Sequence, residues 1–203
     1  QTYNGFTSRT AIDTGEIGDT GLTATFNFLY KKIDGYIDNL ARPADEDPGA
    51  ENVRAGRFAI NYDRGGAFRA NYQIIHSASE TGNVAAQITR VGPNFRAIAL
   101  TLPEITSHRR DQFNYPGLGT ADSILTMHNF TAEYYLNENL VLKSITGYRK
   151  WQDTSAGSVF GEAFTYITPT PDFLGVTTGT GAPFVGANER THEQFTQEVQ
   201  LKA

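Results

Sequence analysis

Residues 22–31 read LTATFNFLYK, and this stretch alternates between apolar and polar positions. Its even positions carry Leu22, Ala24, Phe26, Phe28 and Tyr30. Its odd positions carry Thr23, Thr25, Asn27, Leu29 and Lys31. Successive side chains of a β-strand point to opposite faces, so this alternation predicts a strand with one apolar face.

The same alternation recurs along the chain. We expect seven strands, at about residues 3–13, 22–36, 53–63, 68–79, 123–136, 140–153 and 193–202. A convex face should carry Phe26, Phe28, Tyr30, Phe58, Ile60, Phe68, Tyr72, Ile74, Phe130 and Tyr134. The concave face should carry Asn27, Arg57, Asn61, Arg69, Asn71, Gln73 and Glu133. Long strands with one apolar face are typical of a transmembrane barrel, because they exceed the usual five or six residues.

The connections between these strands alternate in length. Short connections at residues 18–21, 64–67 and 137–139 are rich in Gly, Asn and Asp, which favour hairpin turns. Long connections fall at residues 37–52, 81–120 and 156–192. In an antiparallel up-and-down meander, all short turns then lie on one rim and all long loops on the other. The fold class that we predict is therefore all-β, a meander that forms part of a transmembrane β-barrel.

Composition excludes several other classes. The chain has 203 residues, a formal net charge of −5, 13 Phe, 10 Tyr and no Cys. This aromatic content argues against a disordered chain, and the absence of Cys excludes disulfides and thiolate metal sites. The mildly acidic balance argues against a nucleic-acid partner. Because the chain opens on Gln1 and closes on Ala203 directly after a strand-like run, we expect an internal piece of a longer protein.

Two motifs carry a resemblance to a known family. Residues 140–149 read LVLKSITGYR and are followed, after a long loop, by TQEVQL at residues 196–201. Residues 13–22 read DTGEIGDTGL and are followed by DGYIDN at residues 34–39. In order and spacing these motifs resemble the barrel domain of TonB-dependent outer-membrane receptors. The resemblance covers nearly the whole chain, and the two later long loops match least.

The resemblance implies a function. Receptors of this family reside in the outer membrane of Gram-negative bacteria and take up scarce nutrients such as ferric siderophores, cobalamin-like molecules or carbohydrates. The implied partners are a small-molecule or oligosaccharide ligand, outer-membrane lipid, and the TonB complex through N-terminal sequence that this chain lacks. The family's plug domain is also missing from the sequence, and the seven strands would be roughly the second to the eighth of the barrel.

The candidate site residues belong to the outer loops and strand ends. A basic set in the second long loop could meet an anionic ligand or lipid phosphates, because Arg binds such groups in a bidentate manner: Arg90, Arg96, His108, Arg109, Arg110 and Tyr115. Tyr36, Tyr148 and Trp151 are expected near outer strand ends as membrane-interface aromatics, with ligand stacking as the alternative. Asp45, Asp47 and Glu51 do not match a calcium-loop spacing, so we expect a solvated acidic loop.

No catalytic constellation can be assembled from the sequence. The four histidines lack metal-ligand spacing, and no phosphate-binding loop or nucleophile elbow is present. We therefore expect no enzyme activity, no metal and no cofactor. Two alternative interpretations stay open: a small eight-stranded outer-membrane barrel with a structural or adhesive role, and a soluble carbohydrate-binding β-sandwich.

Overall fold

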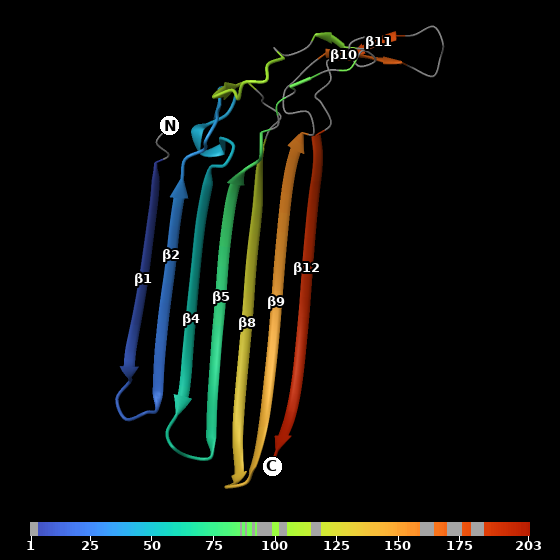
Figure 1. Ribbon diagram of the computed structural model, residues 1–203. Coiled ribbons are helices and arrows are strands. Elements are labelled where there is room, and N and C mark those ends of the chain that lie inside the picture. Colours follow the sequence, from blue (N-terminus) through green and yellow to red (C-terminus); the bar gives the residue numbers. More distant parts are fainter. Residues whose placement is uncertain are drawn as a thin grey trace.

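The computed structural model describes residues 4–85, 87, 89, 90, 92, 99–101, 105–114, 119–158, 165–169, 176–179 and 185–203. Seven long strands form one sheet (Figure 1): β1 (Gly5–Glu16), β2 (Leu22–Ile33), β4 (Glu51–Asp63), β5 (Phe68–Gly82), β8 (Thr120–Asn137), β9 (Leu140–Ser158) and β12 (Val185–Lys202).

The sheet is an antiparallel meander in which each strand pairs with the next one along the chain. Its order is β1-β2-β4-β5-β8-β9-β12, and every pairing within it is antiparallel. The three short turns lie at one end of the sheet and the longer connections at the other (Figure 1). The predicted seven-stranded meander is confirmed.

Several strands extend further toward the long loops than the sequence indicated. The largest difference is in β12, which was expected at residues 193–202 and begins at Val185. Its first residue pairs with Ser158, the last residue of β9, so the expected loop at residues 156–192 is shorter by several residues at each end. By contrast, β2 ends at Ile33 rather than at residue 36, because the chain bends at Tyr36 and Ile37 to enter the first loop.

Cross-strand register fixes the two faces of the sheet. One row of directly paired residues crosses all seven strands on a single face: Ile12, Phe26, Phe58, Ile74, His128, Tyr148 and Phe195. Because side chains alternate along a strand, the ten expected apolar residues share this face, here called the apolar face. The seven expected polar residues share the opposite one, the polar face.

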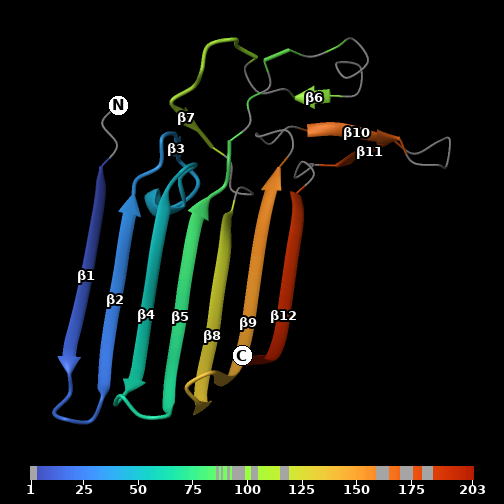
Figure 2. The ribbon, with the colours of Figure 1, turned by 60° about the horizontal axis from the view of Figure 1, so that its bottom comes forward.

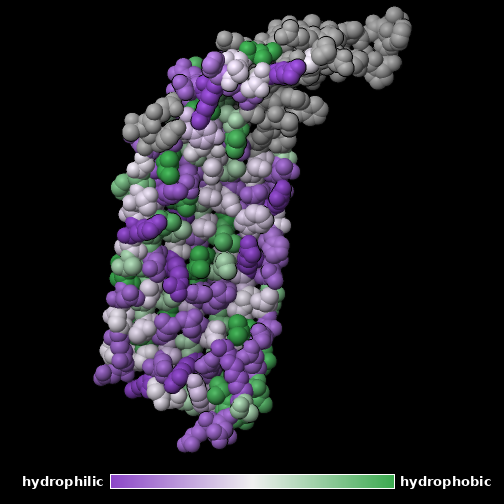
Figure 3. Space-filling model, viewed as in Figure 1, coloured by the Kyte–Doolittle hydropathy of each residue, from purple (hydrophilic) through white to green (hydrophobic). Residues whose placement is uncertain are grey.

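Neither face is covered by a second layer within the described part of the chain. Large apolar-face side chains are exposed, among them Phe6 at 60%, Phe26 at 43% and Phe195 at 66%. In the space-filling view hydrophilic side chains predominate on the visible face, with hydrophobic ones scattered among them (Figure 3). A sandwich would bury the aromatics between sheets, so the exposure argues against that alternative.

Several short elements lie at the long-loop end of the sheet (Figure 2). The first long connection holds β3 (Asp38–Asn39) and the 3₁₀ turn η1 (Ala44–Glu46), and the second holds β6 (Ala99–Thr101) and β7 (Gln112–Phe113). The third holds β10 (Thr165–Pro169) and β11 (Val176–Gly179). Strands β11, β10 and β6 form a small antiparallel sheet that links the second and third connections.

Candidate functional site

The first two long loops are joined into one cap over the long-loop end of the sheet. Strand β3 pairs in parallel with β7, so that Asp38 lies beside Gln112 and Asn39 beside Phe113. The Leu40 amide donates to the Phe113 carbonyl over 2.9 Å. The Phe113 side chain is buried and packs against Ile37 and Ala85. This apolar contact gives the cap a small core of its own.

A cavity of about 180 Å³ opens beside this core. Its lining residues are Tyr36, Ile37, Ala85, Gln87, Arg109, Arg110 and Phe113. The guanidinium carbon of Arg109 lies 5.3 Å from the centre of the Tyr36 ring, within the range of a cation–π interaction. Gly49 also lies close to the ring: a Cβ built there would lie 2.1 Å from ring atoms of Tyr36.

The basic segment of the second loop is held in place by one side-chain amide. Gln87 Nε2 donates to the carbonyls of Thr106 and His108 over 2.8 and 2.9 Å. Gln87 Oε1 accepts from the Arg110 amide over 3.2 Å. These three bonds fix the backbone around Arg109. An open hollow of about 610 Å³ adjoins this segment, and His108, Arg109 and Arg110 are among its lining residues.

Asp47 organises the first loop from within. Its Oδ1 accepts a hydrogen bond of 2.7 Å from the backbone amide of Asn39, and both residues are buried. Burial raises the pKa of the Asp47 carboxyl, and the neighbouring carboxylates of Asp38, Asp34 and Asp45 act in the same direction, whereas the Asn39 amide opposes them. The Asp47 carboxylate thus has a structural role as a hydrogen-bond acceptor, although burial and the neighbouring carboxylates disfavour its charged form.

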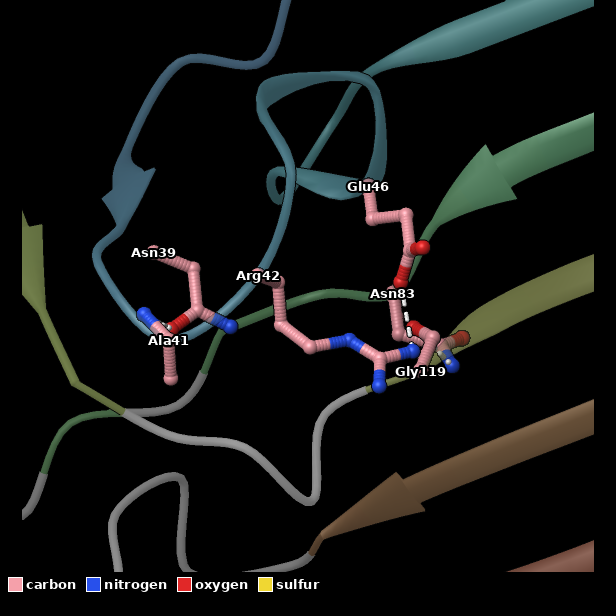
Figure 4. A network of polar contacts seen from close by, with 6 residues as sticks. All are labelled: Asn39, Ala41, Arg42, Glu46, Asn83 and Gly119. Carbon is pink, nitrogen blue, oxygen red and sulfur yellow. Dashed lines mark hydrogen bonds and ion pairs between the residues drawn. The ribbon is translucent and has the colours of Figure 1, made fainter.

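A set of polar contacts closes the base of the cap (Figure 4). Arg42 Nη2 and Glu46 Oε2 form an ion pair of 2.5 Å within the first loop. Asn83 Nδ2 donates to the Gly119 carbonyl over 3.0 Å, which ties the two ends of the second long connection together. Asn39 Oδ1 accepts from the Ala41 amide over 3.3 Å. The cap is therefore anchored at the ends of β5 and β8.

The structure brings together part of the predicted basic set. His108, Arg109 and Arg110 lie side by side in the cap, whereas Arg90 is exposed and lines neither cavity. Arg96 and Tyr115 lie outside the described residues. Gln87 and Phe113 support the cap but were missed, because a glutamine and a lone phenylalanine have no spacing that signals a role. Asp47 was expected in a solvated acidic loop, and this expectation is wrong for it, because its carboxylate is buried and accepts from the Asn39 amide.

The three aromatics expected at the membrane interface lie in three different environments. Tyr36 belongs to the cap. Tyr148 lies on the apolar face near the middle of β9, not at its outer end, and donates to Glu193 Oε1 over 2.8 Å. Trp151 lies on the polar face, where its Nε1 donates to Ser123 Oγ over 2.8 Å. For Trp151 the interface role and the alternative of ligand stacking both stay predictions, and its place on the polar face fits the alternative better.

Within the described residues, no three acidic, histidine or cysteine side chains are grouped to hold a metal ion. No described helix is long and apolar enough to cross a membrane. Comparison with known proteins gives no match: no family model, no curated protein and no solved structure is significantly similar to this chain. The functional argument therefore has to come from the sheet and its cap.

Proposed function

We propose that this chain is part of a large outer-membrane β-barrel, a receptor of the TonB-dependent type that takes up a scarce nutrient in a Gram-negative bacterium. The observation that carries the proposal is a slope in the apolar face. Membrane strands are tilted, so a band of lipid-facing residues should cross the cross-strand rows obliquely, not follow them.

The slope is measurable between the two edge strands. On β1, large apolar-face hydrophobics extend from Phe6 to Ile12, and on β12 from Phe195 to Leu201. Register connects Phe6 with Glu189 and Ile12 with Phe195. On β12 the band therefore begins at Phe195 instead of Glu189 and ends at Leu201 instead of Phe195. Both limits of the band are displaced by six residues along β12.

This displacement corresponds to a physical tilt. Six residues at ~3.3 Å per residue give about 20 Å, and six strand spacings at ~4.8 Å give about 29 Å. The corresponding angle is about 35°, within the range of barrel strands. A water-exposed sheet has no reason to displace its apolar residues in this manner.

Charged residues follow the same slope above the band. The first charged apolar-face residues are Lys32 in β2, Arg54 in β4, Lys150 in β9 and Glu193 in β12. Lys32, the first charged apolar-face residue of β2, lies in the same cross-strand row as Glu189 of β12. The first charged residue of β12 is Glu193, so the charged boundary lies four residues further along β12 than that row. Strands β5 and β8 depart from the trend, because their first charged apolar-face residues, Glu80 and Asp122, lie in the same row as Lys32.

Strand direction favours a barrel larger than this chain alone. With seven strands in a meander, β1 and β12 run in the same direction (Figure 1). Closing them onto each other would require a parallel pair, whereas an up-and-down barrel is antiparallel throughout. An odd number of further strands would be needed, one for the eight-stranded alternative and many more for a receptor of the TonB-dependent type.

The cap supports a receptor role. It rises from the long-loop rim, which would face the outside, and it offers a cavity with Tyr36, Arg109 and Arg110 to a ligand. Ferric siderophores, cobalamin-like molecules and carbohydrates all belong to the substrates of this type of receptor. Energy coupling through the TonB complex would be performed by sequence outside this chain.

Single-cysteine labelling tests the membrane topology, because the chain has no cysteine of its own. Phe26→Cys on the apolar face and Asn27→Cys on the polar face are matched neighbours in β2. In intact outer membranes a water-soluble maleimide should label Asn27→Cys and spare Phe26→Cys. Equal labelling of both would contradict a lipid-facing apolar side. Uptake of a labelled nutrient that depends on the gene and stops with an uncoupler would test the receptor role.

A further inference from the structure

The polar face carries a stripe that differs from the rest of that face. Two consecutive rows cross the seven strands at mid-height. The upper row holds Arg9, Leu29, Ala55, Ser77, Leu125, Trp151 and His192. The lower row holds Ala11, Asn27, Arg57, Ile75, Met127, Arg149 and Gln194. Neither row contains an acidic residue. Three arginines, Arg9, Arg57 and Arg149, lie among the apolar residues of the two rows.

These arginines have no carboxylate partner within 4 Å among the described residues. The ion pairs of the strands lie elsewhere, at Lys31–Glu51, Arg69–Asp63 and Lys143–Glu133. The row on either side of these two contributes one acid each: Asp13 in the edge strand β1, which accepts from Thr25, and Asp153 in β9, beside Arg190 of the edge strand β12. Positive charge therefore exceeds negative charge across this part of the polar face.

At the β1, β2 and β4 end of the stripe the surface is hollowed. The hollow has a volume of about 470 Å³, and Arg9 and Arg57 lie among its lining residues together with Leu29, Ala55 and Ile75. The small side chain of Ala55 on the polar face leaves room for the depression. Arg57 Nε donates to Gln73 Oε1 over 3.1 Å, which leaves its two terminal nitrogens available as donors.

We infer that this hollow binds a small anionic molecule with a flat apolar body, such as an aromatic sulfonate or carboxylate. Arg57 and Arg9 supply charge-assisted hydrogen bonds to the anion, and Leu29, Ala55 and Ile75 supply the apolar floor. The volume lies within the range of about 300–1,000 Å³ that is usual for small-molecule sites. This inference rests on the proposed function, under which the polar face lines the barrel lumen, and it selects anionic aromatic solutes over neutral oligosaccharides as substrates.

Calorimetric titration of the natural full-length protein, folded in non-ionic detergent, tests the inference. Naphthalene-1,5-disulfonate serves as the probe. Its neutral analogue naphthalene-1,5-disulfonamide, inorganic phosphate and maltohexaose serve as comparison ligands. The disulfonate should bind at least tenfold more tightly than each of these, because only the disulfonate offers both the charge and the apolar body. Equal affinity for the disulfonamide or for phosphate would overturn the inference.

Matched variants locate the binding. Arg57→Gln should weaken disulfonate binding about tenfold or more, since a hydrogen bond between charged groups is lost. Ala55→Leu should weaken it without any change of charge, because it fills the hollow. Arg54→Gln removes the same charge from the same strand on the opposite face and should leave the affinity unchanged. Equal losses in Arg57→Gln and Arg54→Gln, or no binding by a folded protein that passes the cysteine-labelling test, would refute the site while leaving the proposed function standing.

Discussion

Arg109 places its guanidinium carbon 5.3 Å from the centre of the Tyr36 ring, and this contact joins the first long loop to the second. Both residues line the cap cavity. The position of the ring depends on Gly49, whose φ of +80° and close approach to the ring leave no room for a side chain. The geometry of the cap cavity therefore depends on a residue that contributes no side chain to it.

Gly49→Ala should loosen the cap. The added Cβ would lie 2.1 Å from the Tyr36 ring, so the ring has to move and its contact with Arg109 is disturbed. We expect trypsin to cleave after Arg42 and Arg109 several-fold faster than in the parent protein. Gly65→Ala is the matched control, because Gly65 has a similar φ of +73° but no atom within 4 Å of the added Cβ. Equal acceleration in both variants would mean that backbone strain, not the Tyr36 contact, is responsible.

Asp47 should make the cap sensitive to pH. Its pKa in the folded state is raised above the unfolded value, chiefly by burial. The folded state then binds the proton more tightly, so the cap gains stability as pH falls from neutral through the raised pKa and loses it as pH rises again. The measurement is hydrogen exchange of the peptide that contains Asn39, expressed as protection relative to the intrinsic rate.

Substitutions separate the charge of Asp47 from its role as acceptor. Asp47→Asn keeps the acceptor for the Asn39 amide and removes the charge, so protection should be higher than in the parent at neutral pH and no longer vary with this titration. Asp47→Ala loses the acceptor and should reduce protection at every pH, by about 1–3 kcal/mol for an unpaired buried amide. Asp45→Asn, on an exposed neighbour, should change little. Protection that varies with pH as strongly in Asp47→Asn as in the parent would contradict this assignment.

The polar face contains a charge ladder near the short-turn rim. Asp63, Arg69, Glu133 and Lys143 are consecutive cross-strand neighbours of alternating sign, with ion pairs of 3.1 Å for Arg69–Asp63 and 2.8 Å for Lys143–Glu133. The Lys143–Glu133 pair is the less exposed of the two. Glu133→Gln should therefore lower the stability against urea in detergent by about 1 kcal/mol, and Asp63→Asn by clearly less. A larger loss in Asp63→Asn would show that exposure does not set the strength of these pairs.

Most of the sheet could be predicted from sequence, because alternation reports a strand wherever one face is apolar. The predicted strand bounds were too short where the contrast between an apolar and a polar face ends. Residues 188–192 of β12 carry polar side chains on both faces, among them Glu189 and Arg190, so they gave no period-two signal. Backbone hydrogen bonding to β9 nevertheless continues to Val185. Strand ends beyond an apolar band are set by pairing with the neighbour, which a single sequence does not display.

The cap could be predicted only in part. Adjacent arginines at positions 109 and 110 were recognisable as a basic segment in a long loop. The contacts that position them were not, because the parallel pairing of β3 with β7 joins residues far apart in the chain. Phe113 lies in a polar stretch without periodicity, so its burial against Ile37 had no local signal. Likewise, Trp151 was expected at the membrane interface from its proximity to a strand end, and its register places it on the polar face.

The slope of the apolar band gives the sharpest prediction. Ser8 in β1 and Thr191 in β12 lie in one cross-strand row, on the apolar face and at the two edges of the sheet. Ser8 lies between Phe6 and Ile12, inside the band of β1, whereas Thr191 lies beyond Phe195, outside the band of β12. Ser8→Arg should therefore reduce the stability of the folded protein in lipid vesicles by about 2 kcal/mol, as for a cation on the lipid face of a barrel. Thr191→Arg should cost less than about 0.5 kcal/mol, since it meets water and headgroups. Urea unfolding of vesicle-inserted protein, followed by the electrophoretic heat shift, measures both values. Similar costs for the two variants would mean that the rows lie parallel to the membrane, and the tilt inferred from register would be wrong.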